Sequence, residues 1–110
     1  MEFEVGEYIR TPYHSIEKIK RISKENGWTC VTTNRDAYDL KWLKNNKVKH
    51  SKNIIDLIKV GDYVNGYTVI DVYEYYICVC DFGKSEDLRE EDIKSIVTRE
   101  QFDRMEYKVE

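Results

Sequence analysis

The pentapeptide Val5-Gly-Glu-Tyr-Ile9 recurs as Val60-Gly-Asp-Tyr-Val64, with residues of the same type at all five positions. The second copy begins 55 positions after the first in a chain of 110 residues, so the motif opens two stretches of similar length. Self-similarity of this kind indicates repeated structural units. We therefore expect two related halves, residues 1–59 and 60–110, that pack together because a unit of about fifty residues is marginally stable alone.

The ends of the two halves also follow one pattern. Val48–Ser51 precedes Asn53, and Ile93–Val97 precedes Thr98, so each half is predicted to end in a short strand that runs into a helical turn. Asparagine and threonine are favoured N-cap residues because their side-chain oxygens accept from the unpaired N–H groups of the first turn. Gln101 lies three residues after Thr98, as a capping box requires.

The residues between these landmarks have strand-like composition and are punctuated by glycine and a single proline. We expect a bent strand at Ile16–Ile22 and short strands at Trp28–Thr32 and Tyr38–Trp42. Tyr67–Cys80 is the richest β region, with a turn near Asp71–Tyr75. The segment 86–92 is expected to be a loop or a helical turn.

Short strands separated by glycine turns favour a small β-barrel over a helical bundle. We predict a mainly β protein with minor α content, built from two related SH3-like, small-barrel halves that are each closed by a short helical turn. The residues expected to form the packing between the halves are Val5, Ile9, Ile55, Leu57, Val64, Ile70, Ile93, Ile96 and Phe102.

Composition restricts the class of protein. Hydrophobic residues make up 41% and charged residues 35%, which is apolar enough for a folded core. No apolar run approaches the roughly 18 residues of a membrane span, and Met1–Val5 lacks the features of a signal peptide. Three cysteines, an odd number, argue against a disulfide framework. We expect a cytoplasmic protein.

Charge is divided between the halves. Residues 1–59 carry 12 Lys and Arg against 8 Asp and Glu, whereas residues 60–110 carry 6 against 13. The two blocks either attract one another within the fold or steer a charged partner, and the sequence leaves both open. The basic block contains Lys41, Lys44, Lys47, Lys49 and Lys52, and the acidic block contains Glu86, Asp87, Glu90, Glu91 and Asp92.

No catalytic pattern stands out. Cys78 and Cys80 would share one face of a strand, but the remaining metal-ligand candidates, Cys30, His14 and His50, have no characteristic spacing. The apolar neighbours of Cys78 should raise the pKa of its thiol, which disfavours a nucleophile. The dispersed glycines form no phosphate-binding loop. We predict a protein without catalytic residues, metal or cofactor.

Two kinds of binding remain. In the first, the tyrosines Tyr73 and Tyr76 anchor a protein partner, since tyrosine offers a large contact area at little entropic cost. The acidic block, Glu86, Asp87, Glu90, Glu91 and Asp92, would then complement a basic surface on that partner. In the second, the chain binds nucleic acid through Lys41, Trp42, Lys44, Lys47 and Lys49. A pI of about 5.5 makes direct nucleic-acid binding the second choice.

Two segments, His50–Gly66 and Glu91–Phe102, resemble small, largely uncharacterised proteins of phages, prophages and mobile elements of Gram-positive bacteria. The resemblance implies a non-enzymatic protein of the bacterial host cytoplasm that blocks a host macromolecule. A CRISPR-Cas effector or another defence complex is the plausible target, which makes an anti-CRISPR type of inhibitor the leading expectation. An SH3-like nucleic-acid-binding module is the alternative.

Overall fold

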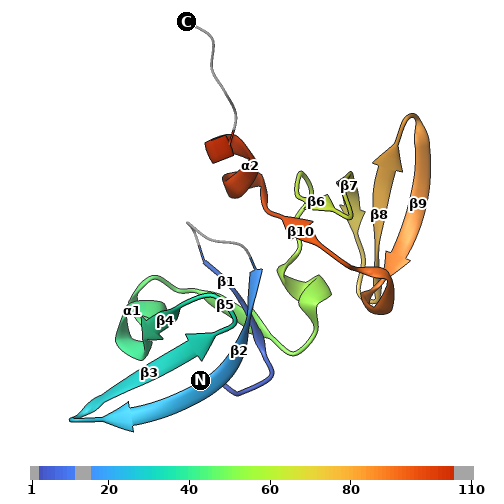
Figure 1. Cartoon of the computed structure of the whole chain (residues 1–110). Coiled ribbons are helices and arrows are strands. Elements are labelled where there is room, and N and C mark those ends of the chain that lie inside the picture. The colour runs from blue at the N-terminus through green and yellow to red at the C-terminus, as the bar shows by residue number, and fades with distance from the viewer. Residues whose placement is uncertain (1–2, 12–15, 106–110) are drawn as a thin grey trace, which may run out of the picture.

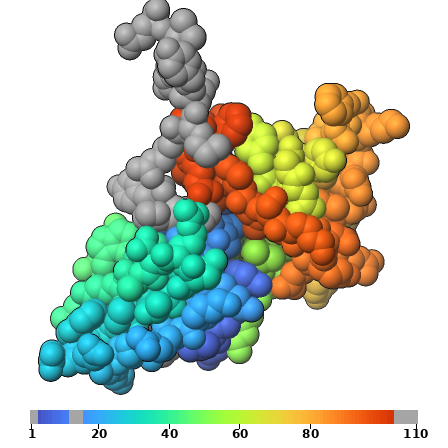
Figure 2. Space-filling model, viewed as in Figure 1, coloured from blue at the N-terminus to red at the C-terminus, as the bar shows by residue number. Residues whose placement is uncertain are grey.

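Two antiparallel five-stranded sheets dominate the computed structural model, which describes residues 3–11 and 16–105 (Figure 1). Each sheet comes from one half of the chain, and the halves lie side by side in the space-filling view (Figure 2). Helices are short and few in the described residues. The prediction of a mainly β protein is therefore confirmed.

The first sheet has the strand order β4-β3-β2-β1-β5. Helix α1 (Leu40–Asn45) lies between β4 and β5 along the chain, and the 3-10 helix η1 (Ile54–Leu57) follows β5. The strands are β1 (Tyr8–Arg10), β2 (Ile16–Glu25), β3 (Trp28–Thr33), β4 (Ala37–Asp39) and β5 (Lys49–Ser51).

The second sheet has the order β10-β6-β7-β8-β9. Read from the other edge, this is the order of the first sheet, with the last strand of each half paired to the first. The 3-10 helix η2 (Glu90–Asp92) precedes β10, and α2 (Arg99–Met105) follows it. The strands are β6 (Tyr63–Val64), β7 (Tyr67–Val72), β8 (Tyr76–Asp81), β9 (Lys84–Arg89) and β10 (Ile96–Val97).

Neither sheet closes into a barrel within the described part of the chain. The edge strands β4 and β5 of the first sheet do not pair with each other, nor do β9 and β10 of the second. Closing a barrel requires strands long enough to pair at both edges. Here β4, β5 and β10 have only two or three residues, so the sheets remain open.

Several local predictions agree with the structure. Strand β2 covers the expected bent strand and carries a bulge between Ile19 and Arg21. The expected turn in the region 67–80 separates β7 from β8. Asn53 caps η1 through a 3.1 Å bond from the N–H of Ile55, and Thr98 and Gln101 bond reciprocally at the start of α2.

Two local predictions were wrong. The expected strand at Tyr38–Trp42 stops at Asp39, whose carboxylate accepts the N–H of Lys41 at 2.9 Å and starts helix α1. N-capping therefore outweighed the β-favouring aromatic residues. The segment 86–92 is only partly a helical turn, because Glu86–Arg89 belongs to strand β9 and pairs with β8 along its length.

The core is divided into two clusters rather than gathered around one set of residues. Ile9, Ile19 and Leu43 centre the first cluster, and Val64 and Ile77 the second. Ile55 and Ile58, from the segment after β5, belong to the second cluster. Of the residues expected in the packing, Val5, Ile70 and Phe102 are exposed. Val5 precedes the turn into β1, Ile70 sits in a bulge, and the ring of Phe102 on α2 lies 4.5 Å from that of Tyr63 but stays outside both core clusters.

The repeated pentapeptide forms the same turn in both halves. Gly6 and Gly61 have φ values of 94° and 99°, which side chains rarely adopt, so glycine is needed there. The acid that follows folds back: the Glu7 carboxylate accepts the N–H of Glu4 at 2.7 Å, and the Asp62 carboxylate accepts the N–H of Lys59 at 2.8 Å. Each acid thereby fixes the entry into the first strand of its sheet.

Asp62 also joins the two halves. Its buried carboxylate accepts hydrogen bonds from both terminal nitrogens of Arg10, at the end of β1. It also accepts one from the backbone N–H of Arg99 at 2.9 Å. Arg10 additionally donates to the carbonyl of Leu57 at 3.0 Å and to the carboxylate of Glu100 at 2.8 Å. A forked guanidinium–carboxylate pair fixes orientation as well as distance. This cluster sets how the first sheet meets the second.

Burial and charge act against each other in this cluster. Burial lowers the pKa of Arg10, but the carboxylates of Asp62 and Glu100 outweigh that effect and leave it raised, so the guanidinium stays charged. Burial raises the pKa of Glu100, whereas its own backbone N–H and Arg10 lower it, and the net direction is downward. Both directions favour the charged forms of Arg10 and Glu100 near neutral pH.

Replacing Asp62 should destabilise the fold strongly. Asp62→Ala leaves the guanidinium of Arg10 buried without its main partner, and we expect a loss of about 3–5 kcal/mol in the free energy of unfolding, measured by urea denaturation. The control is Lys52→Ala, which breaks the exposed pair with Glu4 and should cost less than about 1 kcal/mol. Equal losses in the two variants would contradict the importance of the buried pair.

Glu100→Gln should have a smaller, pH-dependent effect. A carboxyl whose folded-state pKa is lowered stabilises the protein above its unfolded-state pKa of about 4.3, and this contribution disappears as the pH falls through the folded-state value. Because the side chain is 40% exposed, we expect less than about 1 kcal/mol at pH 7. Thermal unfolding of both proteins at pH 7 and at pH 3 checks this, and a gap that widens in acid would refute it.

Candidate functional site

The five acidic residues singled out from sequence occupy three settings in the second half. Asp87 and Glu86 are exposed neighbours on β9 and point to opposite faces of the sheet. Glu90 and Glu91 are exposed on η2. Asp92, beside them, accepts the N–H of Arg89 at 3.1 Å, so this side chain closes the η2 turn.

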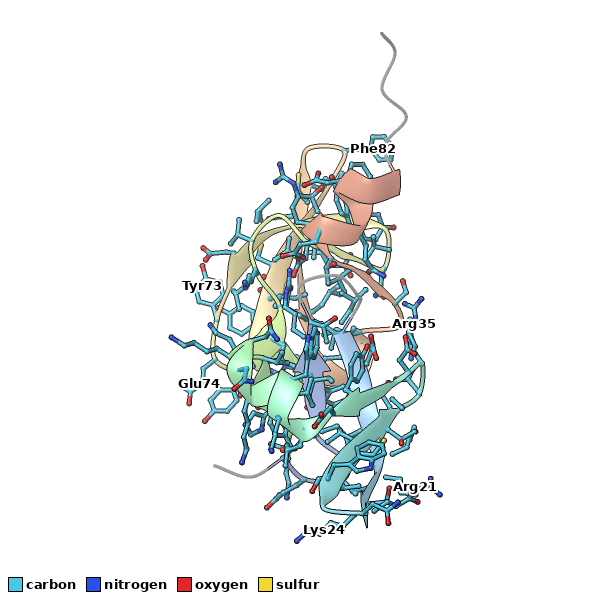
Figure 3. The ribbon with its side chains drawn as sticks, turned by 90° about the vertical axis from the view of Figure 1, so that its left-hand side faces the viewer. Arg21, Lys24, Arg35, Tyr73, Glu74 and Phe82 are labelled. Carbon is cyan, nitrogen blue, oxygen red and sulfur yellow. The ribbon has the colours of Figure 1, made fainter. Side chains whose placement is uncertain are left out.

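Tyr73 and Tyr76 lie together, as ring stacking shows. Their centroids are 4.7 Å apart with 20° between the ring planes, and the Tyr73 hydroxyl donates to Asp71 at 2.8 Å. Tyr73 is 45% exposed and projects from the side of the molecule that also carries Glu74 (Figure 3). A stacked aromatic pair with one exposed and one half-buried ring and a polar rim has the composition of an interface anchor.

Sequence reasoning passed over Tyr75 as an anchor and did not consider Phe82. Tyr75 is 72% exposed, and with Arg89, Glu90 and Glu91 it lines a hollow of about 330 Å³. Phe82 is fully exposed at the tip of the β8–β9 hairpin (Figure 3). The positions of both residues in the sequence could have indicated their exposure. Tyr75 lies in the expected turn, and Phe82 comes directly before a glycine.

We call the combination of these aromatic and acidic residues the tyrosine–acid surface. It joins the outer face of the second sheet to η2 and carries one cation, Arg89, which pairs with Tyr76 in the β8–β9 register. Its members are Tyr73, Tyr75, Tyr76, Asp87, Glu90 and Glu91.

Cys78 lies in the same row of the sheet as two carboxylates. The register places it between Asp71 and Asp87. Burial and the hydrogen bond to the Asp87 carboxylate raise the pKa of the Cys78 thiol, and the charge of Asp71 acts in the same direction. A thiol held protonated in this way is a poor nucleophile.

The lysines of the basic block lie on the other half. Lys41 and Lys44 belong to α1, Lys47 follows it, and Lys49 lies on β5. Lys52 is used locally, in an exposed pair with Glu4 at 3.1 Å.

Three of these lysines line a pocket of about 530 Å³. Lys44, Lys47 and Lys49 form its charged rim. The floor is apolar and includes Phe3, Leu43 and Leu57, which come from the N-terminal segment, α1 and η1. We call this hollow the β5 pocket.

Trp42 is placed apart from the β5 pocket, as is Lys41. The ring of Trp42 stacks on Tyr38 at 5.8 Å and is half-buried against the first core cluster. Tyr38 in turn donates to the buried carboxylate of Glu17 at 3.0 Å, and burial together with this carboxylate raises the pKa of Tyr38. Trp42 thus contributes to packing of the first half.

The acidic and basic blocks do not neutralise each other. Within residues 3–11 and 16–105, no ion pair joins the segment 41–52 to the segment 86–92. The ion pair between the halves is instead made by Arg10, outside both blocks, with Asp62 and Glu100. The opposite charges of the two blocks therefore do not hold the halves together in the described residues.

In the described ranges no group of three His, Cys, Asp or Glu side chains is arranged to hold a metal ion. No helix found there is both long and apolar enough to cross a membrane.

Comparisons with known proteins found no protein family, curated protein or solved structure that matches this chain.

The environment of Cys78 leads to a chemical prediction. Asp87→Asn removes the nearest negative charge and should lower the pKa of the Cys78 thiol, so alkylation of this residue at pH 8 should be several-fold faster. Peptide mass spectrometry follows Cys78 separately, with Cys30 in the first half as the internal control. An unchanged or slower rate at Cys78 would show that Asp87 does not set its reactivity.

Proposed function

We propose that this protein is a non-enzymatic binding protein that docks on a basic surface of another protein through the tyrosine–acid surface. The observation that carries the proposal is the stacked pair Tyr73 and Tyr76 in a half whose exposed carboxylates Asp87, Glu90 and Glu91 form no ion pair within the described residues. Aromatic anchors give contact area, and uncompensated charge gives orientation and a fast encounter.

The geometry favours binding over chemistry at this surface. Asp87 raises the pKa of the neighbouring thiol, and the accompanying hollow beside Tyr75 is small and open to solvent. Tyrosine side chains that are fixed by stacking lose little further entropy when a partner covers them. These features support stoichiometric docking.

The resemblance of His50–Gly66 and Glu91–Phe102 to small phage and mobile-element proteins supplies the biological setting of the proposal. In that setting the partner is a host macromolecule that the protein blocks in the bacterial cytoplasm. A nucleic-acid-binding defence effector, such as a CRISPR nuclease, has the basic surface required and is the first partner to test.

We also propose that the two halves are related copies of a small SH3-like unit. The shared strand order supports this, as do the equivalent turns at Gly6 and Gly61. A third correspondence is the bulge, which follows Ile19 in β2 and Val69 in β7. In both halves the residue at the bulge also exchanges backbone hydrogen bonds with the pentapeptide turn.

Charge reversal on the tyrosine–acid surface tests the proposed function. The tagged full-length protein is used to capture partners from a Gram-positive bacterial lysate, and captured proteins are identified by mass spectrometry. Glu90→Lys with Glu91→Lys, and separately Tyr73→Ala, should each weaken the affinity for the purified partner by at least about tenfold, measured by calorimetry.

The matched control reverses charge on the other half. Lys44→Glu with Lys47→Glu should leave that affinity unchanged. The opposite result, retention on oligonucleotides that is lost with salt and with Lys44→Glu and Lys47→Glu, would replace the proposal with a nucleic-acid-binding module.

A further inference from the structure

The β5 pocket lies beside an unpaired sheet edge. Strand β5 pairs with β1 on one side, and in the described residues no strand pairs with its other side. The consecutive residues Lys49, His50 and Ser51 all line the pocket, as expected where the edge of a strand faces a hollow. An exposed edge offers N–H and C=O groups in register for a further strand.

The pocket walls have the form of a side-chain socket. Helix α1 and η1 flank the hollow, and its floor contains Phe3, Leu43 and Leu57, which are all buried. The volume of about 530 Å³ is in the range of ligand pockets. A bulky apolar side chain projecting from a strand added at β5 would enter this space.

The charges around the socket are unbalanced. Lys44, Lys47 and Lys49 have no carboxylate partner in the described residues. A second hollow shares Lys47 and Lys49 and adds Lys59, so the cationic rim continues past the end of β5. Glu100 pairs with Arg10, and Asp56, which lines the pocket and accepts the Ser51 hydroxyl at 2.6 Å, is one carboxylate against three lysines, so the lining keeps an excess of positive charge.

Strand β10 is the edge strand of the second sheet that corresponds to β5, and its surroundings differ from those of β5. The hollow along β10 is bordered by Ile16 and Ile54 of the first half, and both isoleucines pack against the second core cluster. The β5 pocket, in contrast, is lined only by residues of the first half. The hollow at the β10 edge is therefore bordered by apolar side chains of the other half. The hollow at the β5 edge is bordered by no side chain of the other half among the described residues.

We propose that the free edge of β5 and its pocket bind a short extended acidic peptide, with one large apolar side chain seated on the floor and its acidic neighbours on the three lysines. This is strand addition, in which main-chain bonds give affinity and the pocket gives specificity. The site lies outside the tyrosine–acid surface and makes the protein bivalent.

The floor favours a peptide over a nucleotide. A nucleobase needs hydrogen-bonding partners or an open aromatic face. Here Phe3 is buried, the Ser51 hydroxyl is already bonded to Asp56, and the Nδ1 of His50 lies 3.0 Å from the Glu7 carboxylate. An apolar side chain makes no such demand.

The test uses the full-length protein and synthetic probes. The first probe is a fluorescein-labelled octapeptide with one leucine among aspartate and glutamate residues. Three control peptides have lysine in place of the acids, serine in place of leucine, or N-methyl groups on alternate backbone amides. We expect the first to bind with a dissociation constant of about 100 µM by fluorescence polarisation and each control at least about tenfold more weakly.

Variants of the protein locate the site. Lys44→Glu with Lys47→Glu should weaken peptide binding at least about tenfold, whereas Lys84→Glu with Lys94→Glu, a matched pair of charge reversals at exposed positions of the other half, should not. Hydrogen exchange at residues 49–51 should slow when the peptide is bound. Tyr73→Ala should leave peptide binding intact, which separates this site from the proposed docking function.

Four outcomes would overturn the proposal. They are no binding of the acidic peptide below about 1 mM, full affinity of the N-methylated peptide, preferential binding of a labelled oligothymidylate that depends on Lys44 and Lys47, and concentration-dependent dimers that dissociate in the Lys44→Glu and Lys47→Glu variant. The last two would assign the pocket to nucleic acid and to a second copy of the chain, respectively.

Discussion

The forked pair of Arg10 with Asp62 is the interaction on which the arrangement of the two halves depends. Apolar packing also crosses between the halves, because Ile55 and Ile58 belong to the second core cluster, but apolar contacts are non-directional and do not fix an orientation by themselves. Asp62 receives the guanidinium from the end of β1 while it holds the turn before β6 and the start of α2. A buried charge pair demands defined geometry because desolvation is offset only when the hydrogen bonds are complete. Because the pair joins the first sheet to the second, this geometry fixes one arrangement of the two sheets.

This arrangement keeps the charged blocks apart. Because the ion pair between the halves uses Arg10, the lysines around the β5 pocket and the carboxylates of β9 and η2 stay exposed in separate halves. Unpaired surface charges contribute little to folding, but they act on approaching molecules over about 8–10 Å. The small net charge of the chain thus conceals two surfaces of opposite sign.

Local sequence chemistry predicted much of the fold. The glycine turns, the caps at Asn53 and Thr98 and the bent strand β2 are encoded within a few residues, and each was recognisable. Asp39 was harder, since a strand-like aromatic context concealed an N-cap. Exposure of Ile70 depends on a bulge that only the pairing of β7 with β8 defines. The pocket could not be predicted, because it joins residues from the N-terminal segment, α1, β5 and η1.

The repeated pentapeptide contains a difference of one methylene group, Glu7 against Asp62. The longer acid reaches His50 on β5, with both its oxygens 3.0 Å from the ring nitrogen, whereas the shorter acid is fully enclosed against Arg10. Exchanging the motifs would crowd one site and leave the other short of its partner. The two acids are therefore not interchangeable, and each copy of the pentapeptide is adapted to the half that contains it.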